Sequence, residues 1–190
     1  MSVTQSASLV FTPWMVLRRS VAVVAGALFV ALGAQVAAPL PGTAVPLTLQ
    51  VPAVLIVGAL LGPRLGVASM VTYLAMGIAG LPVFAPGGAP GLARLIGPTG
   101  GYLLAFPVAA ALAGQLAADG RRWGRIAAGL VAGLLAVYAG GVAQLAALGG
   151  GDWALAARLG SVPFLAVDAI KLAVALLLVR RFAPTLRARL

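Results

Sequence analysis

Residues 126–148 read IAAGLVAGLLAVYAGGVAQLAAL, a stretch that contains no charged side chain. A helix that crosses the hydrocarbon core of a bilayer needs about 20 mainly apolar residues, and this run is long enough. The whole chain has the same character, because 62% of its 190 residues are hydrophobic and only 8% are charged. Soluble domains contain about 25% charged residues, so the composition predicts a protein that crosses the membrane several times.

Five further apolar stretches accompany this run and predict an all-α, polytopic membrane protein with six transmembrane helices. We expect a single integral membrane domain over 1–190, with an N-terminal segment of about 1–16 followed by spans at 17–36, 48–62, 65–80, 99–118, 126–148 and 162–179. The second and third spans are short and are joined by a tight Gly-Pro turn at Gly62–Gly66. They form either a helical hairpin that crosses twice, which the placement of Arg64 favours, or a re-entrant hairpin.

Basic residues outside the spans gather on one side of this topology. That side receives Arg18, Arg19, Arg64, Arg121, Arg122, Arg125 and the four C-terminal arginines, Arg180, Arg181, Arg187 and Arg189, whereas the other receives Arg94 and Arg158. Excess positive charge marks the cytoplasmic side, so we expect both termini in the cytoplasm. The net charge of +10 is therefore interpreted as orientation and not as a nucleic-acid surface.

The N-terminus allows a second interpretation. An arginine pair followed by an Ala-rich apolar run also resembles a cleaved signal peptide. Because five apolar runs follow, we favour a first span that is retained in the mature protein.

The absent residue types exclude most catalytic chemistry. The chain has no Cys, His or Glu, and its only acids are Asp119, Asp152 and Asp168. Thiolate, Ser–His and zinc sites cannot be built from this set, and no metal ion or cofactor is implied. Asp119 and Asp152 fall in connections on opposite sides of the membrane, which leaves Asp168 alone. We therefore expect a protein that is not an enzyme.

Asp168 and Lys171 lie within the sixth span, in SVPFLAVDAIKLAVALLLV. A charge at the centre of a span costs about 2.5–3.5 kcal/mol on insertion scales, so it usually has a partner or a function. A spacing of three residues places the two side chains on one helix face, in the outer half of the membrane. They predict part of a ligand site, although an ion pair that only fixes helix packing is the alternative.

The outer connections, at about 37–47, 81–98 and 149–161, supply further candidates. The first two are rich in Pro and Gly yet apolar, so they either fold over a ligand or pack on the helix ends. Arg94 is isolated in the second connection, and its guanidinium could hold a carboxylate. Gln50, Phe84 and Tyr102 lie near the same boundary and are weaker candidates, because bridging amides and interfacial aromatic residues are common there.

Several strings in the chain resemble those of the BioY family, the biotin-binding S components of energy-coupling-factor (ECF) transporters. They occur in the family order and at family-like distances between about Val45 and Lys171: VPLTLQ, LLGPRLG, YLAMGIAGLPVF, LIGPTGGYL and VPFLAVDAIK. The resemblance implies a six-helix S-component fold in the cytoplasmic (inner) membrane of a prokaryote. It also implies that biotin lies near the outer surface, in contact with Asp168, Lys171 and Arg94.

The resemblance further implies partners. S components dock their first helix on a transmembrane coupling subunit that is driven by a pair of ATPases, and Ala27 and Ala31 are the best match to the small-residue face that docks. No Walker motif is present, so ATP hydrolysis would belong to those separate subunits. A homo-oligomer is a further option. The alternatives to biotin uptake are a carrier for another small vitamin and a non-transporting membrane scaffold.

Overall fold

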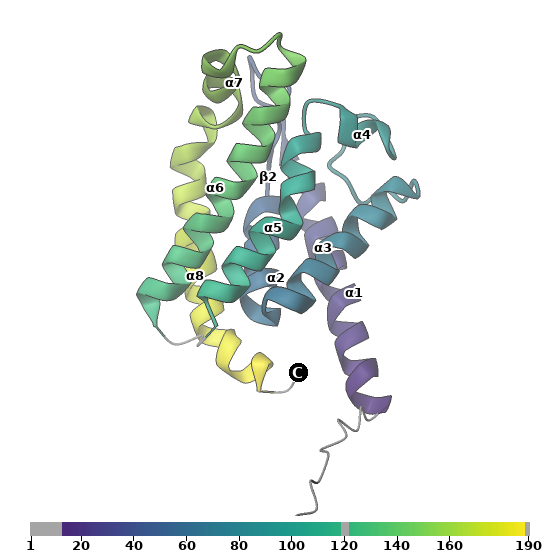
Figure 1. Ribbon diagram of the computed structural model, residues 1–190, viewed down its shortest axis with the longest axis vertical. Helices are drawn as coiled ribbons and strands as arrows, with labels where there is room; N and C mark the ends of the chain where they lie inside the picture. Colours follow the sequence, from purple (N-terminus) through teal and green to yellow (C-terminus); the bar gives the residue numbers. More distant parts are fainter. Residues whose placement is uncertain (1–12, 119–121, 189–190) are drawn as a thin grey trace, which may run out of the picture.

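The computed structural model describes residues 13–118 and 122–188, most of which form a bundle of helices (Figure 1). The elements, in chain order, are α1 (Pro13–Gln35), β1 (Ala37–Ala38), β2 (Leu47–Thr48), α2 (Gln50–Leu61), α3 (Pro63–Ile78), α4 (Ala93–Ile96), α5 (Gly100–Leu116), α6 (Trp123–Leu148), α7 (Trp153–Gly160), the 3-10 turn η1 (Val162–Phe164) and α8 (Leu165–Arg187). The two short strands pair antiparallel, with Ala37 opposite Thr48. Most of the predicted N-terminal segment of about 1–16 lies outside the described residues, as do Asp119, Arg121 and Arg189.

Each predicted span coincides with one helix, although the lengths differ. By length and composition, three helical segments of the described chain could cross a membrane: Pro13–Gln35, Trp123–Leu148 and Trp153–Arg187. The helices α2 and α5 are apolar but shorter. The sharp turn before α3 is confirmed, because Gly62 has φ +83° and Pro63 begins the helix. Such a φ is natural only for glycine, and proline suits the first helical turn.

The predicted connection at 149–161 is not a simple loop. It contains α7, whose N-terminus is capped by the Asp152 side chain: the Leu155 backbone N–H donates to Asp152 Oδ1 at 2.8 Å. Asp is one of the residues preferred at the N-cap of a helix, so Asp152 was a feature of the sequence from which the start of α7 could have been predicted. The segment then passes through η1 directly into α8, which extends past the predicted end at 179 to Arg187.

Close helix crossings hold the bundle together. The helices α5 and α6 meet at Gly101 and Gly140, where a Cβ on either residue would overlap the carbonyl oxygen of the other. Apolar side chains have no hydrophobic drive to associate within lipid, so close approach of small residues supplies the packing. The α5–α6 pair therefore forms a rigid support for the residues at its upper end.

The last turn of α8 folds under the bundle. The Arg187 guanidinium donates to the carbonyl oxygens of Ala59 and Ala118 at 2.5 Å and of Gly114 at 3.1 Å. These carbonyls belong to the C-terminal ends of α2 and α5, which lack helical partners and carry partial negative charge. A single cation thus joins three helices at this end.

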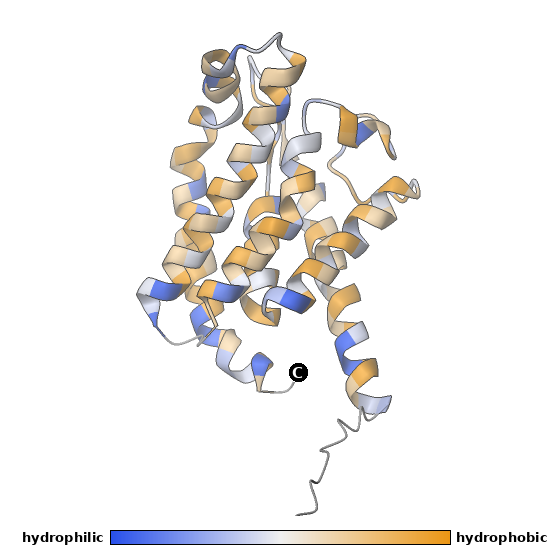
Figure 2. Ribbon diagram, in the orientation of Figure 1, coloured by the Kyte–Doolittle hydropathy of each residue, from blue (hydrophilic) through white to orange (hydrophobic). Residues whose placement is uncertain are grey.

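The two ends of the bundle differ in chemistry. Hydrophilic residues gather at the lower end of the view, around the starts of α1, α3 and α6 and the end of α8 (Figure 2). The β ribbon, α4 and α7 all lie at the upper end (Figure 1). The start of α1 and the end of α8 therefore share the basic end, and the irregular connections share the other.

Candidate functional site

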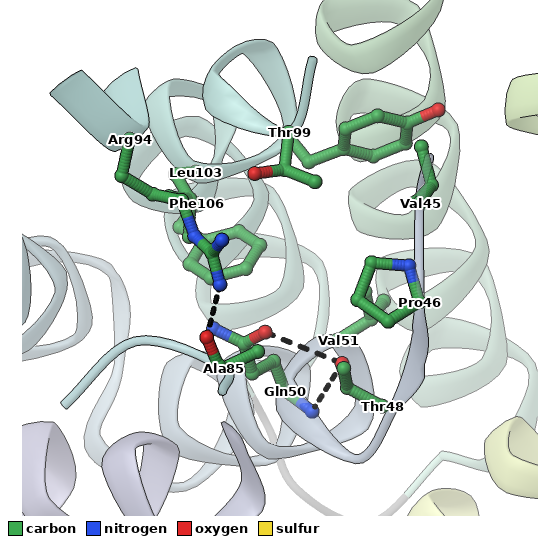
Figure 3. Close-up of a pocket in the computed structure, with 11 residues that line it drawn as sticks. Val45, Pro46, Thr48, Gln50, Val51, Ala85, Arg94, Thr99, Leu103 and Phe106 are labelled. Carbon is green, nitrogen blue, oxygen red and sulfur yellow. Dashed lines mark hydrogen bonds between the residues drawn. The ribbon is translucent and has the colours of Figure 1, made fainter. Parts of the chain in front are cut away.

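A small cavity of about 60 Å³ lies at the upper end, between α2, α5, the β ribbon and the connection that carries α4 (Figure 3). A volume of this size holds only a few water molecules. Its walls combine apolar side chains with a few polar groups, as is common for ligand sites. The lining residues are Val45, Pro46, Thr48, Gln50, Val51, Ala85, Arg94, Thr99, Tyr102, Leu103 and Phe106.

Thr48 and Gln50 are tied together beside this cavity, where β2 passes into α2. The Thr48 hydroxyl donates to Gln50 Oε1 at 3.3 Å and accepts the Gln50 backbone N–H at 3.2 Å (Figure 3). Gln50 Nε2 donates to the Tyr73 hydroxyl at 2.6 Å, and that hydroxyl donates to the Val83 carbonyl at 3.1 Å. The Gln50 amide is therefore held in one orientation, and α3 is connected to the outer loop.

Arg94 enters the cavity from α4 and is 8% exposed. Its guanidinium donates to the Ala85 carbonyl oxygen across the same connection (Figure 3). Burial lowers the pKa of Arg94, and the nearby Tyr73 partly offsets this effect. An arginine remains charged under these conditions, so this cavity contains a buried cation whose hydrogen-bond partner is a backbone carbonyl and not a carboxylate.

A second polar cluster surrounds Asp168 on α8. Its Oδ1 accepts from Lys171 Nζ at 2.9 Å, and its Oδ2 accepts from the Tyr138 hydroxyl of α6 at 2.6 Å. Lys171 Nζ also donates to the Thr48 carbonyl oxygen at 2.9 Å. The side chains of Lys171 and Asp168 are 13% and 7% exposed, so the ion pair is largely shielded from the surroundings.

Thr48 joins the two clusters. Its carbonyl oxygen contacts Lys171, and its hydroxyl contacts Gln50. A continuous series of hydrogen bonds therefore runs from Tyr138 on α6, through α8, β2, α2 and α3, to the Val83 carbonyl. Buried networks of this kind fix a single arrangement when all members are satisfied.

The structure brings together most of the predicted site residues. Gln50, Arg94 and Tyr102 line the cavity, and Lys171 reaches its wall through Thr48. Asp168 lies one contact further away, on Lys171. Phe84 does not line this cavity. Its ring packs edge-on against Tyr73, with centroids 5.5 Å apart, and so supports the base of the cavity indirectly.

Tyr102 connects the cavity to α7. Its hydroxyl donates to the Gly160 carbonyl at 2.7 Å, and its ring lies where a Cβ on Gly141 would be. The small residues on α6 and α7 thus make room for a tyrosine that projects from α5.

Three residues of the network had no place among the predicted site residues: Thr48, Tyr73 and Tyr138. A tyrosine in the middle of an apolar run was the available signal, because a buried hydroxyl in lipid seeks a partner. That signal does not name the partner, which lies on another helix. Thr48 contributes a backbone carbonyl, for which side-chain chemistry gives no signal.

Two glutamines hold the connection between α3 and α5. Gln35 Nε2 donates to the carbonyls of Pro82 and Phe84 at 3.3 and 3.4 Å, and Gln144 Nε2 donates to those of Leu95 and Gly97 at 2.9 and 2.6 Å. The loop is thus attached at both ends, to α1 and to α6.

Between these attachments, a second cavity of about 310 Å³ adjoins the first and shares Pro46 and Arg94 with it. It lies between the two Pro- and Gly-rich connections. Arg94 therefore lies at the boundary between the smaller, inner cavity and the larger, outer one.

Ala27 and Ala31 do not face outward. They are 0% and 8% exposed, on the side of α1 that packs against α2 and α3, whereas Leu28 and Leu32 of the same helix are exposed. The expectation that these two alanines form a docking surface finds no support in their placement, because small residues here serve contacts within the bundle.

The model of the BioY family matches residues 4–188. The chain belongs to the BioY family. A probable biotin transporter BioY of Pyrococcus horikoshii is 43% identical over 158 residues, which cover 82% of this chain and 91% of that protein. The biotin transporter BioY of Thermotoga maritima is 41% identical over 80% of this chain and 88% of its own length.

A solved structure of the same architecture supports this assignment. The S component for biotin from an ECF-type ABC transporter superposes with a TM-score of 0.80 at 26% identity, over 90% of this chain and 93% of that one. The fold of this BioY-family chain is therefore the S-component fold, and it is a multi-pass membrane protein.

Proposed function

We propose that this chain is the membrane-embedded subunit that captures biotin for uptake. Family membership, biotin transporters among its relatives and the S-component fold support this function. Within the chain itself, the observation that carries the proposal is the Asp168–Lys171 pair, held by Thr48 at the edge of the cavity. An apolar helix packs without either charge. Two charged side chains within a span cost free energy of insertion, and a ligand that contacts both of them accounts for their presence.

The pair matches a ureido ring in chemistry. Such a ring offers N–H donors beside a carbonyl acceptor, and Asp168 and Lys171 present an acceptor beside a donor. Two of the three ammonium donors of Lys171 are used by Asp168 and Thr48, which leaves one for a ligand carbonyl. Asp168 accepts one hydrogen bond on each oxygen and retains capacity for a ligand N–H.

Arg94 and Tyr102 suit the opposite end of the vitamin. In our proposal the valerate carboxylate replaces the Ala85 carbonyl as the acceptor of Arg94, because a charged acceptor binds a guanidinium more strongly than a neutral one. The inner cavity of about 60 Å³ is too small for a bicyclic vitamin. Movement of Arg94 would join it to the neighbouring cavity of about 310 Å³. Gln50 would orient the ligand from the cavity wall, and Phe84 would support the base of the cavity through its contact with Tyr73.

The proposed topology is six spans in one domain of residues 1–190, with the basic end in the cytoplasm of a prokaryote. The placement of the start of α1 and the end of α8 at the basic end supports it. We further propose that a separate ECF coupling subunit and ATPase pair supply the energy. The outward face of α1, with Leu28 and Leu32, is available for such a partner.

Calorimetric titration of biotin into detergent-purified protein tests the proposal, beside Asp168→Asn and Lys171→Ala variants. We expect one-to-one binding that both substitutions weaken at least 100-fold while the variants remain folded by circular dichroism. Absence of heat with folded wild-type protein would redirect the search to other small vitamins. Binding that survives both substitutions would keep biotin as the ligand but refute the proposed site. The ion pair would then serve only to fix helix packing.

A further inference from the structure

Tyr138 is the third contact of the charged pair, and it comes from a different helix. Its hydroxyl donates to Asp168 Oδ2 at 2.6 Å, whereas Lys171, on the same helix as Asp168, takes Oδ1. Counted over the whole residue, Tyr138 is 8% exposed and Asp168 is 5% exposed. This hydrogen bond is short and involves a charged acceptor, which places it among the stronger ones in proteins.

The position of Tyr138 is itself fixed by α6. This helix packs along α5 through the Gly101–Gly140 crossing, two residues further along the chain. The hydroxyl therefore projects from a rigid support toward α8. A tyrosine ring has only two rotatable side-chain bonds, so its hydroxyl is placed with little entropic cost.

Without this contact, Asp168 would have one anchored oxygen. A carboxylate that is held at Oδ1 alone can rotate about its terminal bond, because that torsion is broad. The second donor fixes the plane of the group. One accepting direction on each oxygen is then used within the protein, and the remaining directions have defined orientations.

We propose that Tyr138 is a positioning residue for vitamin recognition, which orients the Asp168 carboxylate so that a free lone pair meets a ureido N–H of the ligand. The inference rests on the proposed function, because it concerns the same site. It adds that specificity for the ureido group depends on α6 as well as on the two charges of α8. A tyrosine that contributed only packing would affect stability and leave this recognition unchanged.

A double-mutant cycle separates the two roles, with biotin affinity as the readout. The proteins are wild type, Tyr138→Phe, Asp168→Asn and the double variant. We expect Tyr138→Phe to bind biotin roughly 10-fold more weakly, as for the loss of one charged hydrogen bond. In the Asp168→Asn background the same substitution is expected to change affinity less than about 3-fold, because residues that act through each other are not additive.

Ser69→Ala is the matched control. It removes another fully buried hydroxyl, which donates within α3 to the Leu65 carbonyl at 2.9 Å. We expect it to leave biotin affinity unchanged. If Tyr138→Phe does not fold, 3-fluorotyrosine at position 138 keeps the ring shape and alters the donor strength; its effect on affinity should likewise require Asp168.

The outcomes are distinct. Failure of folded wild-type protein to bind biotin overturns the proposed function and this inference with it. Binding by wild type together with an affinity of Tyr138→Phe within about twofold of it overturns the inference alone. An equal loss in both backgrounds also overturns it, because Tyr138 would then act independently of Asp168.

Discussion

The ammonium of Lys171 lies 2.9 Å from the backbone carbonyl oxygen of Thr48, although 123 positions separate these residues in the chain. The contact joins α8 to the short strand β2 that forms one wall of the cavity. The same ammonium is paired with Asp168 at 2.9 Å. The charged pair is thereby attached to the cavity wall, and its contribution to stability can be separated by experiment from its proposed role in binding.

Removal of one charge should lower the stability much more than removal of both. Lys171→Met leaves a shielded carboxylate without its cation, which typically costs about 3–5 kcal/mol, so we expect a clear fall in the melting temperature in detergent. The Asp168→Asn/Lys171→Met double variant should regain most of that stability, because no buried charge is left unpaired. It should nevertheless fail to bind biotin. Recovery of binding in the double variant would refute a direct role of the charges.

Arg94→Gln should weaken the binding of biotin about 10- to 100-fold, as for the loss of a charge-assisted pair. A biotin amide lacks the carboxylate, so its affinity should be nearly the same for wild type and variant. Competition titration with both ligands measures the difference. Equal losses for the acid and the amide would show that Arg94 does not bind the carboxylate end.

Gln144→Ala should loosen the connection around α4. The substitution removes the amide that donates to the Leu95 and Gly97 carbonyls. The loss of each hydrogen bond typically costs about 0.5–1.5 kcal/mol of stability. We expect hydrogen exchange at residues 93–99 to become roughly 10-fold faster, as for a segment with lower local stability. Gln115→Ala, which replaces an exposed glutamine of α5, is the control. Unchanged exchange in Gln144→Ala would mean that the loop is held by other contacts.

Gly140→Val should destabilise the protein far more than Gly124→Val, although both glycines lie on α6. A Cβ at Gly140 overlaps the Gly101 carbonyl oxygen, whereas a Cβ at Gly124 meets nothing within 4 Å. Forced separation of α5 and α6 should cost about 1–3 kcal/mol or more. Thermal unfolding in detergent compares the two. Similar melting temperatures would contradict the close crossing.

Arg187→Ala should lower stability by about 1–3 kcal/mol, because it removes donors to three carbonyls at the ends of α2 and α5. The exposed Arg158 of α7 offers a matched control, since Arg158→Ala removes the same charge from the opposite end. Only the first variant should melt earlier. An equal response would show that loss of net charge, and not the lost contacts, is responsible.

Local sequence was sufficient for the helices and for the charged pair. Apolar runs separated by Pro, Gly and Arg located the helices α1, α2, α3, α5, α6 and α8 of the described chain, because a segment in lipid must satisfy its own backbone hydrogen bonds. The i, i+3 spacing predicted that Asp168 and Lys171 would meet, and they do. The ends of elements were less predictable: α7 was missed, and the end of α8 at Arg187 depends on contacts with α2 and α5.

The contacts of the site depended on helices that are distant in sequence. The chain by itself determined a helical membrane protein, its basic end and one charged pair, since these follow from composition and local spacing. Only the tertiary structure placed Thr48 against Lys171, Tyr138 against Asp168 and Arg94 at the cavity, and turned Phe84 and Ala31 away from the expected surfaces. The reason is physical: the direction of a buried side chain is set by the helices that pack around it, and one sequence window contains none of them.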